Sequence, residues 1–130
     1  MMKRLIILLM TVLLLTGCTA RPSASTYRQI TAQEAAELME SETGYIVLDV
    51  RTPEEYAERH IPGAINVPNE TIGSTAPEQL PDKGQLILIY CRSGNRSKQT
   101  ADKLAALGYT NIVEFGGISS WPGETVAGSE

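Results

Sequence analysis

The fold of this chain is decided by LILIYCRSGNRSKQTADKL, residues Leu86–Leu104. The stretch opens with an apolar run, and both faces of the strand that it predicts would be apolar, as in a parallel sheet covered on both sides. Cys91 ends the run, and a short loop containing Gly94 follows. A helix is then predicted from about Arg96 to Leu107, with apolar positions roughly on one face. The stretch therefore predicts a strand–loop–helix unit with a cysteine at the mouth of the loop.

The remaining sequence continues this alternation of strands and helices. Two capping boxes mark helix starts, Thr31 with Glu34 and Thr52 with Glu55. The pattern is typical of an α/β fold with a small, mainly parallel sheet flanked by helices. The expected elements are strands over residues 27–30, 45–50, 64–67, 85–90 and 111–115, helices over 32–39, 53–59 and 96–107, a helical turn near 77–80, a turn at 116–117 and a closing turn over 118–121.

The first residues predict a targeting segment rather than part of the fold. Lys3 and Arg4 precede an apolar run over Leu5–Thr16, which is long enough for a signal-peptide core and too short for a spanning helix. The run ends in LTGC, which resembles the lipobox of bacterial lipoproteins, and that resemblance implies lipidation of Cys18. The alternative is an uncleaved anchor with an incidental cysteine. Both readings predict an exported protein held at a membrane, on its periplasmic or extracellular face.

The expected organisation follows from this reading. It comprises a signal peptide over residues 1–17, a lipid anchor and tether over 18–26, one domain over 27–122 and a flexible tail over 123–130. If Cys18 carries a lipid, Cys91 is the only free thiol of the 130-residue chain. Such a thiol is either buried and inert or kept for its chemistry.

Composition excludes several classes of function. The formal net charge of −4, with no basic patch in the sequence, argues against a nucleic acid partner. One histidine and one free cysteine are too few for a metal site, so no metal and no cofactor are expected. The chain is expected to be a monomer.

The loop after Cys91 has the chemistry of an anion site. Ligands bind outside the carboxyl ends of parallel strands, where loop N–H groups and a helix N-terminus converge. Gly94 allows backbone conformations closed to other residues. Arg92 and Arg96 add positive charge, and such surroundings lower the pKa of a cysteine. The sequence therefore predicts a nucleophilic thiolate in a cradle for a small anion that carries sulfur or phosphorus.

Three blocks identify the family that the chain resembles. LDVRTPEEYAERHIPGAINVP, YCRSGNRS and LAALGYTNIVEFGGISSW occur in the order seen in single-domain rhodaneses. The resemblance implies a three-layer sandwich and a sulfurtransferase. In that family the loop cysteine takes the outer sulfur of thiosulfate, releases sulfite and passes the sulfur from a persulfide to cyanide or a thiol.

The resemblance also implies the site residues. Cys91 takes the place of the nucleophile. Asp49 and Arg51 take the place of a supporting salt-bridged pair, with an ordinary surface pair as the alternative. Arg59 stands where the family often has glycine, away from the loop in sequence, and is not expected to alter the chemistry. The cradle and substrate contacts fall on Arg92, Ser93, Gly94, Asn95, Arg96 and Ser97.

Other functions remain open at this point. Four residues separate Cys91 from Arg96, whereas the phosphatases related to rhodaneses have five, so phosphoryl transfer is disfavoured. A sulfur-delivery module or a redox thiol protein acting with a partner would share the chemistry of Cys91. His60 suggests a Cys–His pair, but it lies in HIPGA, a structural turn in the family.

Overall fold

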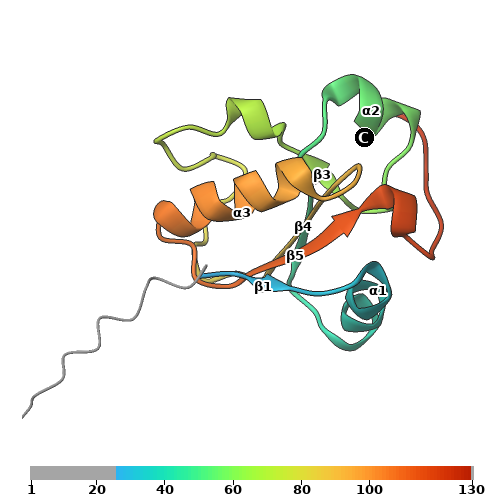
Figure 1. The fold of residues 1–130 in the computed structure, drawn as a ribbon, viewed down its shortest axis with the longest axis horizontal. Helices are drawn as coiled ribbons and strands as arrows, with labels where there is room; N and C mark the ends of the chain where they lie inside the picture. Colours follow the sequence, from blue (N-terminus) through green and yellow to red (C-terminus); the bar gives the residue numbers. More distant parts are fainter. Residues whose placement is uncertain (1–25, 130) are drawn as a thin grey trace, which may run out of the picture.

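The computed structural model describes residues 26–129, so the predicted signal peptide and Cys18 lie outside the described residues. The described part is a five-stranded sheet between helices (Figure 1). None of the helices in this range is long and apolar enough to cross a membrane. The elements in chain order are β1 (Arg28–Gln29), α1 (Ala32–Ser41), β2 (Ile46–Asp49), α2 (Pro53–Glu58), β3 (Ile65–Asn66), η1 (Asn69–Thr71), β4 (Ile87–Cys91), α3 (Asn95–Ala106), β5 (Ile112–Gly117) and η2 (Ile118–Ser120).

The sheet has the order β1-β5-β4-β2-β3, and every strand pair is parallel. The buried strand predicted around Cys91 is β4, which lies at the centre. The second buried strand is β2, its neighbour. The prediction of an α/β fold with a small parallel sheet flanked by helices is therefore confirmed.

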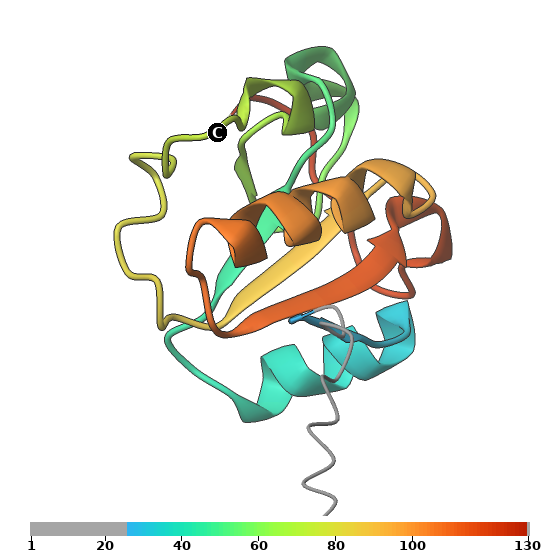
Figure 2. The ribbon, with the colours of Figure 1, turned by 60° about the vertical axis from the view of Figure 1, so that its left-hand side comes forward.

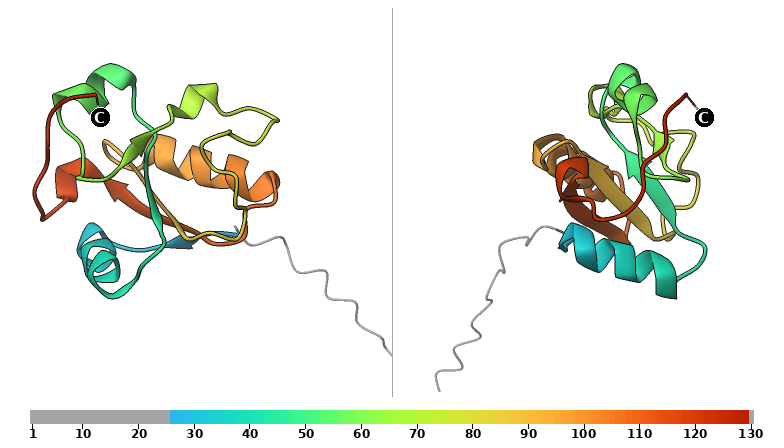
Figure 3. Two further views of the ribbon diagram at one scale, coloured as in Figure 1. Left: turned by 180° about the vertical axis from the view of Figure 1, so that it is seen from behind. Right: turned by 90° about the vertical axis from the view of Figure 1, so that its right-hand side faces the viewer.

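Alternate residues of the strands build two apolar cores, one on each face of the sheet. On one face Ile87 and Ile89 pack with Ala101 and Leu104 of α3. On the other, Leu88 packs in a core that includes α1 and α2. Figure 2 shows α3 and α1 on opposite sides of the sheet, and Figure 3 shows the same layers from behind and from the side. The continuous apolar runs of β2 and β4 follow from this double burial.

Both helix starts form as their sequences predict. The side-chain oxygens of Thr31 and Thr52 each accept a hydrogen bond from the backbone N–H three residues later. The carboxylates of Glu34 and Glu55 in turn accept a hydrogen bond from the backbone N–H of the threonine. The helical turn predicted near 77–80 is present as one hydrogen-bonded turn, in which the N–H of Leu80 donates to the carbonyl of Pro77 at 3.1 Å. The same loop before β4 also contains the short helix η1, which the sequence did not predict.

The segment predicted as a flexible tail over residues 123–130 is hydrogen-bonded to the domain at two points. The backbone of Val126 exchanges both hydrogen bonds with His60, at 2.8 and 2.9 Å. The N–H of Gly128 also bonds to the carbonyl of Ala57 at 2.9 Å. The sequence does not indicate the pairing of His60 with Val126, because a bridge of one residue leaves no periodic pattern.

The two glycines predicted as a turn belong to β5 instead. Gly117 lies opposite Cys91 across the β4–β5 ladder, beyond an irregularity in register between Ile89 and Cys91. A Cβ atom on Gly117 would lie 1.9 Å from the carbonyl oxygen of Arg92. Lack of a side chain at Gly117 therefore allows β5 to approach the loop that follows Cys91.

We expect Gly117→Ala to destabilise the fold by about 1–3 kcal/mol, because backbone must move to admit the methyl group. Gly73→Ala is the matched control, since a Cβ there meets nothing within 4 Å and its φ is not positive. The measurement is the free energy of unfolding in urea. Equal stability of the two variants would show that the approach at Gly117 is not tight.

Candidate active site

The site lies where the chain direction changes across the sheet. From β2 the chain passes through α2 to β3 on one side, and from β4 it passes through α3 to β5 on the other side. In open α/β sheets, ligands bind at the carboxyl ends of strands at such a switch point. The side chains that follow β2 and β4 therefore share one edge of the sheet.

Cys91 is the last residue of β4, and its side chain is buried under the loop, with the residue 1% exposed. The N–H of Gly94 donates to Sγ at 3.0 Å. The Ser97 hydroxyl lies 3.4 Å from Sγ. The loop therefore wraps around the sulfur, as the sequence predicted.

The surroundings of Cys91 act on its pKa in opposite directions. Burial raises the pKa of the thiol, while hydrogen bonds from the Ser97 hydroxyl and from the backbone N–H groups of Ser97, Gly94 and Ser93 lower it. The net shift of the pKa is downward. Hydrogen-bond donors thus favour the thiolate despite burial. Loop amides and Ser97 do this by direct contact with the sulfur.

Gly94 has the conformation that the loop requires. Its φ is +113°, a left-handed region that disfavours side chains, and it precedes the first residue of α3. Asn95 and Ser93 are exposed on the rim, as is Arg92. The predicted cradle is therefore assembled around Cys91, with Gly94 and Ser97 inside and the other residues at its edge.

Arg96 is held by an ion pair that the sequence did not indicate. Its two terminal nitrogens bind the two carboxylate oxygens of Glu55 at 2.6 and 3.0 Å. Glu55 also forms the capping box of α2 with Thr52. One carboxylate therefore closes the start of α2 and fastens it to the start of α3. The bond from Arg96, together with the capping contacts, lowers the pKa of Glu55 to about 2 against burial.

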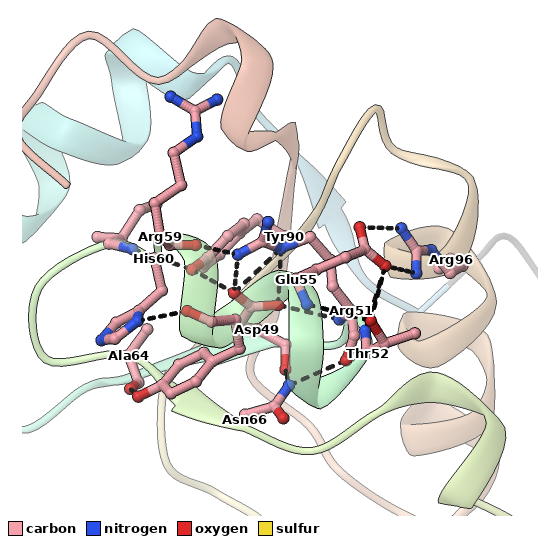
Figure 4. A network of polar contacts seen from close by, with 12 residues as sticks. Asp49, Arg51, Thr52, Glu55, Arg59, His60, Ala64, Asn66, Tyr90 and Arg96 are labelled. Carbon is pink, nitrogen blue, oxygen red and sulfur yellow. Dashed lines mark hydrogen bonds and ion pairs between the residues drawn. The ribbon is translucent and has the colours of Figure 1, made fainter. Parts of the chain in front are cut away.

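Asp49 and Arg51 form a buried pair rather than a surface one. The Arg51 Nη2 lies 2.6 Å from Asp49 Oδ2, and the two residues are 4% and 0% exposed, respectively. Tyr90 of β4 donates its hydroxyl to the same oxygen at 2.7 Å. Arg51 also donates to the carbonyl of Arg59 at 2.6 Å. Figure 4 shows this network joining β2, β4 and the end of α2.

A pocket of about 320 Å³ opens between the two halves of the site. Arg51 and Arg59 line it from the β2–α2 side, and Arg92 lines it from the loop after β4. Figure 4 shows the guanidinium of Arg59 extending away from the Asp49 network. Sequence distance from the loop hid this position, because the fold brings the end of α2 beside the loop. The remaining lining residues are Glu55, Glu58, Ile118 and Ser119.

His60 lies in a structural setting. It is 1% exposed and stacks on Tyr56 with ring centroids 3.7 Å apart. Its Nδ1 lies 2.8 Å from the carbonyl oxygen of Tyr56. These contacts fix the turn after α2, and the backbone of His60 pairs with Val126.

Glu114 is a further residue of the site that the sequence did not indicate. It lies on β5, is 2% exposed, and its Oε1 accepts hydrogen bonds from Ser97 Oγ and Gly116 N–H, both at 2.7 Å. A single acidic residue within an apolar strand can equally face solvent. Its position opposite Ser97 depends on the pairing of β4 with β5, which the sequence does not show.

Comparison with known proteins gives one consistent result. The family described as Rhodanese-like domain matches residues 31–124. Thiosulfate sulfurtransferase PspE of Escherichia coli (strain K12) is 37% identical over 71 residues, which make up 55% of this chain and 68% of that protein. Thiosulfate sulfurtransferase GlpE of Pseudomonas entomophila (strain L48) is 31% identical over 110 residues, 81% of this chain and 97% of that protein.

A solved structure gives the same likeness in three dimensions. The structure described as a rhodanese with anions from E. coli matches with a TM-score of 0.60 at 33% identity. The match covers 65% of this chain and 99% of that chain. Cys91 and its loop lie inside the residues that the family matches.

The Glu55–Arg96 pair makes stability depend on pH in the acid range. The pKa of Glu55 in the fold, about 2, lies below its ordinary value of 4.5. The pair therefore stabilises the fold above pH 4.5, and this contribution is lost as the pH falls towards about 2. We expect Glu55→Gln to unfold more easily at neutral pH, by about 1 kcal/mol for a partly exposed pair. Its free energy of unfolding should fall less steeply between these pH values.

Glu54→Gln is the matched control for this prediction, because Glu54 is exposed and precedes Glu55 on the same helix turn. The measurement is urea unfolding at a series of pH values. Parallel pH profiles for the wild type and Glu55→Gln would contradict the assignment.

Proposed function

The chain belongs to the rhodanese-like domain family, and we propose that it moves sulfane sulfur from an anionic donor such as thiosulfate to a thiophilic acceptor. Cys91 is the nucleophile in this proposal. The observation that carries it is a buried cysteine at a strand end whose sulfur accepts a backbone N–H and whose pKa is lowered. Relatives named thiosulfate sulfurtransferase share the family.

The proposed reaction has two displacements at sulfur. The Cys91 thiolate attacks the outer sulfur of thiosulfate, a new S–S bond forms, and sulfite leaves with the electrons of the old S–S bond. The resulting persulfide carries a negative charge on its outer sulfur. Cyanide or a thiolate then attacks that sulfur, and Cys91 leaves as the thiolate. Each step conserves charge and regenerates the starting enzyme.

The loop provides what these steps need. Its N–H groups can stabilise the negative charge on sulfur, because donors fixed by the fold require no reorganisation during the reaction. Ser93, Gly94 and Ser97 already favour the thiolate through hydrogen bonds. The persulfide differs from the thiolate by one sulfur atom, and the loop with four residues between Cys91 and Arg96 suits this small group.

Arg92 supports the binding of the donor. It is exposed at the rim of the loop and lines the pocket together with Arg51 and Arg59. Arg51 is already engaged by Asp49, so it acts as a positioning residue that holds the end of β2. The positive charge at the rim matches a donor that bears sulfonate oxygens.

The decisive experiment is the formation of thiocyanate from thiosulfate and cyanide by the chain from Ser23 onward. We expect activity from the wild type and its loss in Cys91→Ala, with a mass gain of about 32 Da on the wild type after thiosulfate alone, which is one sulfur atom added to the nucleophile. Activity retained in Cys91→Ala would overturn the role of Cys91. A folded, reduced wild type without activity would overturn the thiosulfate proposal.

We also propose that the chain is an exported lipoprotein with its lipid on Cys18, in the periplasm or on the outer face of the cell. The support is the sequence before Cys18, where a basic start and an apolar run end in LTGC. A tether over residues 18–26 would then place the sulfur site close to a membrane.

Lipidation is tested by expressing the full chain in a bacterium fed a labelled fatty acid. We expect label on the wild type in the membrane fraction, and an unlabelled product from Cys18→Ala. Cys91→Ala is the matched control, because it removes the other cysteine and should keep the label. An unlabelled wild type would overturn the proposal.

A further inference from the structure

Glu114 is a buried carboxylate with no use in the steps above. It is 2% exposed, and the ion pairs found within residues 26–129 do not include it. Removing a carboxylate from water without a cation is costly unless hydrogen bonds replace the lost solvation. The hydrogen-bond partners of Glu114 therefore determine whether it is charged and what it can exchange a proton with.

Glu114 reaches Cys91 through one hydroxyl. Ser97 Oγ lies 2.7 Å from Glu114 Oε1 and 3.4 Å from Cys91 Sγ. The carboxylate and the sulfur are therefore within about 6 Å of each other, the range in which one charge affects the protonation of another. Ser97 is 0% exposed, so this bridge is buried along its length.

The single proton of the Ser97 hydroxyl links the protonation state of Cys91 to that of Glu114. When that proton points to the Glu114 carboxylate, the Ser97 oxygen can accept the S–H of Cys91, as at 3.4 Å here. A hydroxyl donates only one hydrogen bond. A thiolate needs the Ser97 proton for itself, and Glu114 then keeps only the N–H of Gly116 as a donor unless it carries a proton of its own.

We propose that Cys91 and Glu114 share one proton through Ser97. The S–H bond of Cys91 breaks and its proton passes to Ser97 Oγ, while the Ser97 O–H bond breaks and its proton passes to Glu114 Oε1. The electron pair stays on sulfur. The cluster carries one negative charge before and after the step, so no proton has to reach solvent from the buried site.

The rest of the environment is compatible with this step. Gly116 N–H donates to Glu114 Oε1 at 2.7 Å and holds the carboxyl group in place. The Ser97 hydroxyl also lies 3.0 Å from the carbonyl oxygen of Gly94, which fixes it under the loop. Gly94 also lies close to the carboxylate, since a Cβ atom at this position would be 3.8 Å from Glu114 Oε1.

The charged groups around the cluster come from four directions. Near β1, burial raises the pKa of Tyr27, as do the charges of Asp102 and Glu114. On α3, the pKa of Arg96 is raised by Glu55 of α2 and, more weakly, by Cys91. Arg92 lies in the loop itself. The arginines stay charged and Tyr27 stays neutral around neutral pH, so their own titration does not alter the alkylation of Cys91 there.

The inference rests on the proposed role of Cys91, but its test requires no sulfur donor. The full chain is treated with iodoacetamide over a range of pH, and alkylation is measured on the tryptic peptide GQLILIYCR, residues 84–92, which separates Cys91 from Cys18. A coupled pair loses its protons in two steps that belong to both groups. We expect the wild-type alkylation rate to rise in two steps.

Glu114→Gln should convert this profile to a single step at the lower pH. The amide oxygen still accepts from Ser97 and Gly116, so a merely structural role of Glu114 predicts a single step in both proteins. Between the two wild-type steps, the variant should react about twofold faster, because only part of the wild-type pair is thiolate there. Glu78→Gln, an exposed carboxylate, is the matched control and should keep both steps. A wild-type profile with a single step, at whatever pH, overturns the proposal.

A second measurement decides the matter if Glu114→Gln does not fold. At a pH between the two steps, infrared spectroscopy should show the carbonyl stretch of a protonated carboxyl in the wild type. Cys91→Ala should lack this band, because Glu114 then has no thiol from which to receive the proton. A band of equal strength in both proteins, or its absence from both, overturns the proposal.

Discussion

The site depends on solvating a negative charge at the buried end of β4. Sulfur at Cys91 is screened from water, and burial alone favours the neutral thiol. The fold supplies hydrogen-bond donors in place of water, from Ser93, Gly94 and Ser97. These donors converge only if the chain turns sharply after β4, which explains the left-handed conformation of Gly94. The loop and the buried sulfur therefore require each other.

Two charge pairs then hold the surroundings of this loop. Arg96 is tied to Glu55, which joins the start of α3 to the start of α2. Asp49 is tied to Arg51 and Tyr90, which joins β2 to β4. A buried pair of this kind contributes little net stability compared with apolar residues, but losing one partner costs about 3–5 kcal/mol. Both pairs serve mainly to position the site, because each connects elements on either side of the switch point.

Much of this was accessible from the sequence, because local signals agree with the fold. The apolar run before Cys91 and the capping boxes at Thr31 and Thr52 mark elements that form as predicted. The order of strands and helices also predicts the shared edge where the site lies. These features depend on residues close in sequence, so their patterns can be recognised without knowing the pairing of strands.

The remainder depends on contacts between distant segments. Gly117 was expected in a turn, because adjacent glycines usually break a strand, but β5 uses it to approach Arg92. Val126 carries no signal for pairing with His60, and Arg59 meets Arg92 only across the pocket. Glu114 is missed for the same reason, since only the register of β5 places it under Ser97.

The charges of the site fall into two layers. Arg92 and Arg59 stand at the outer rim, where water screens them and an arriving anion can meet them. Cys91, Ser97 and Glu114 lie beneath, where no arginine hydrogen bond reaches the sulfur among residues 26–129. If cations bound the sulfur directly, they would hold its charge and weaken its attack. In the proposed reaction, the cations at the rim attract the anionic sulfur donor, and the neutral N–H and O–H groups below leave the thiolate free to attack it.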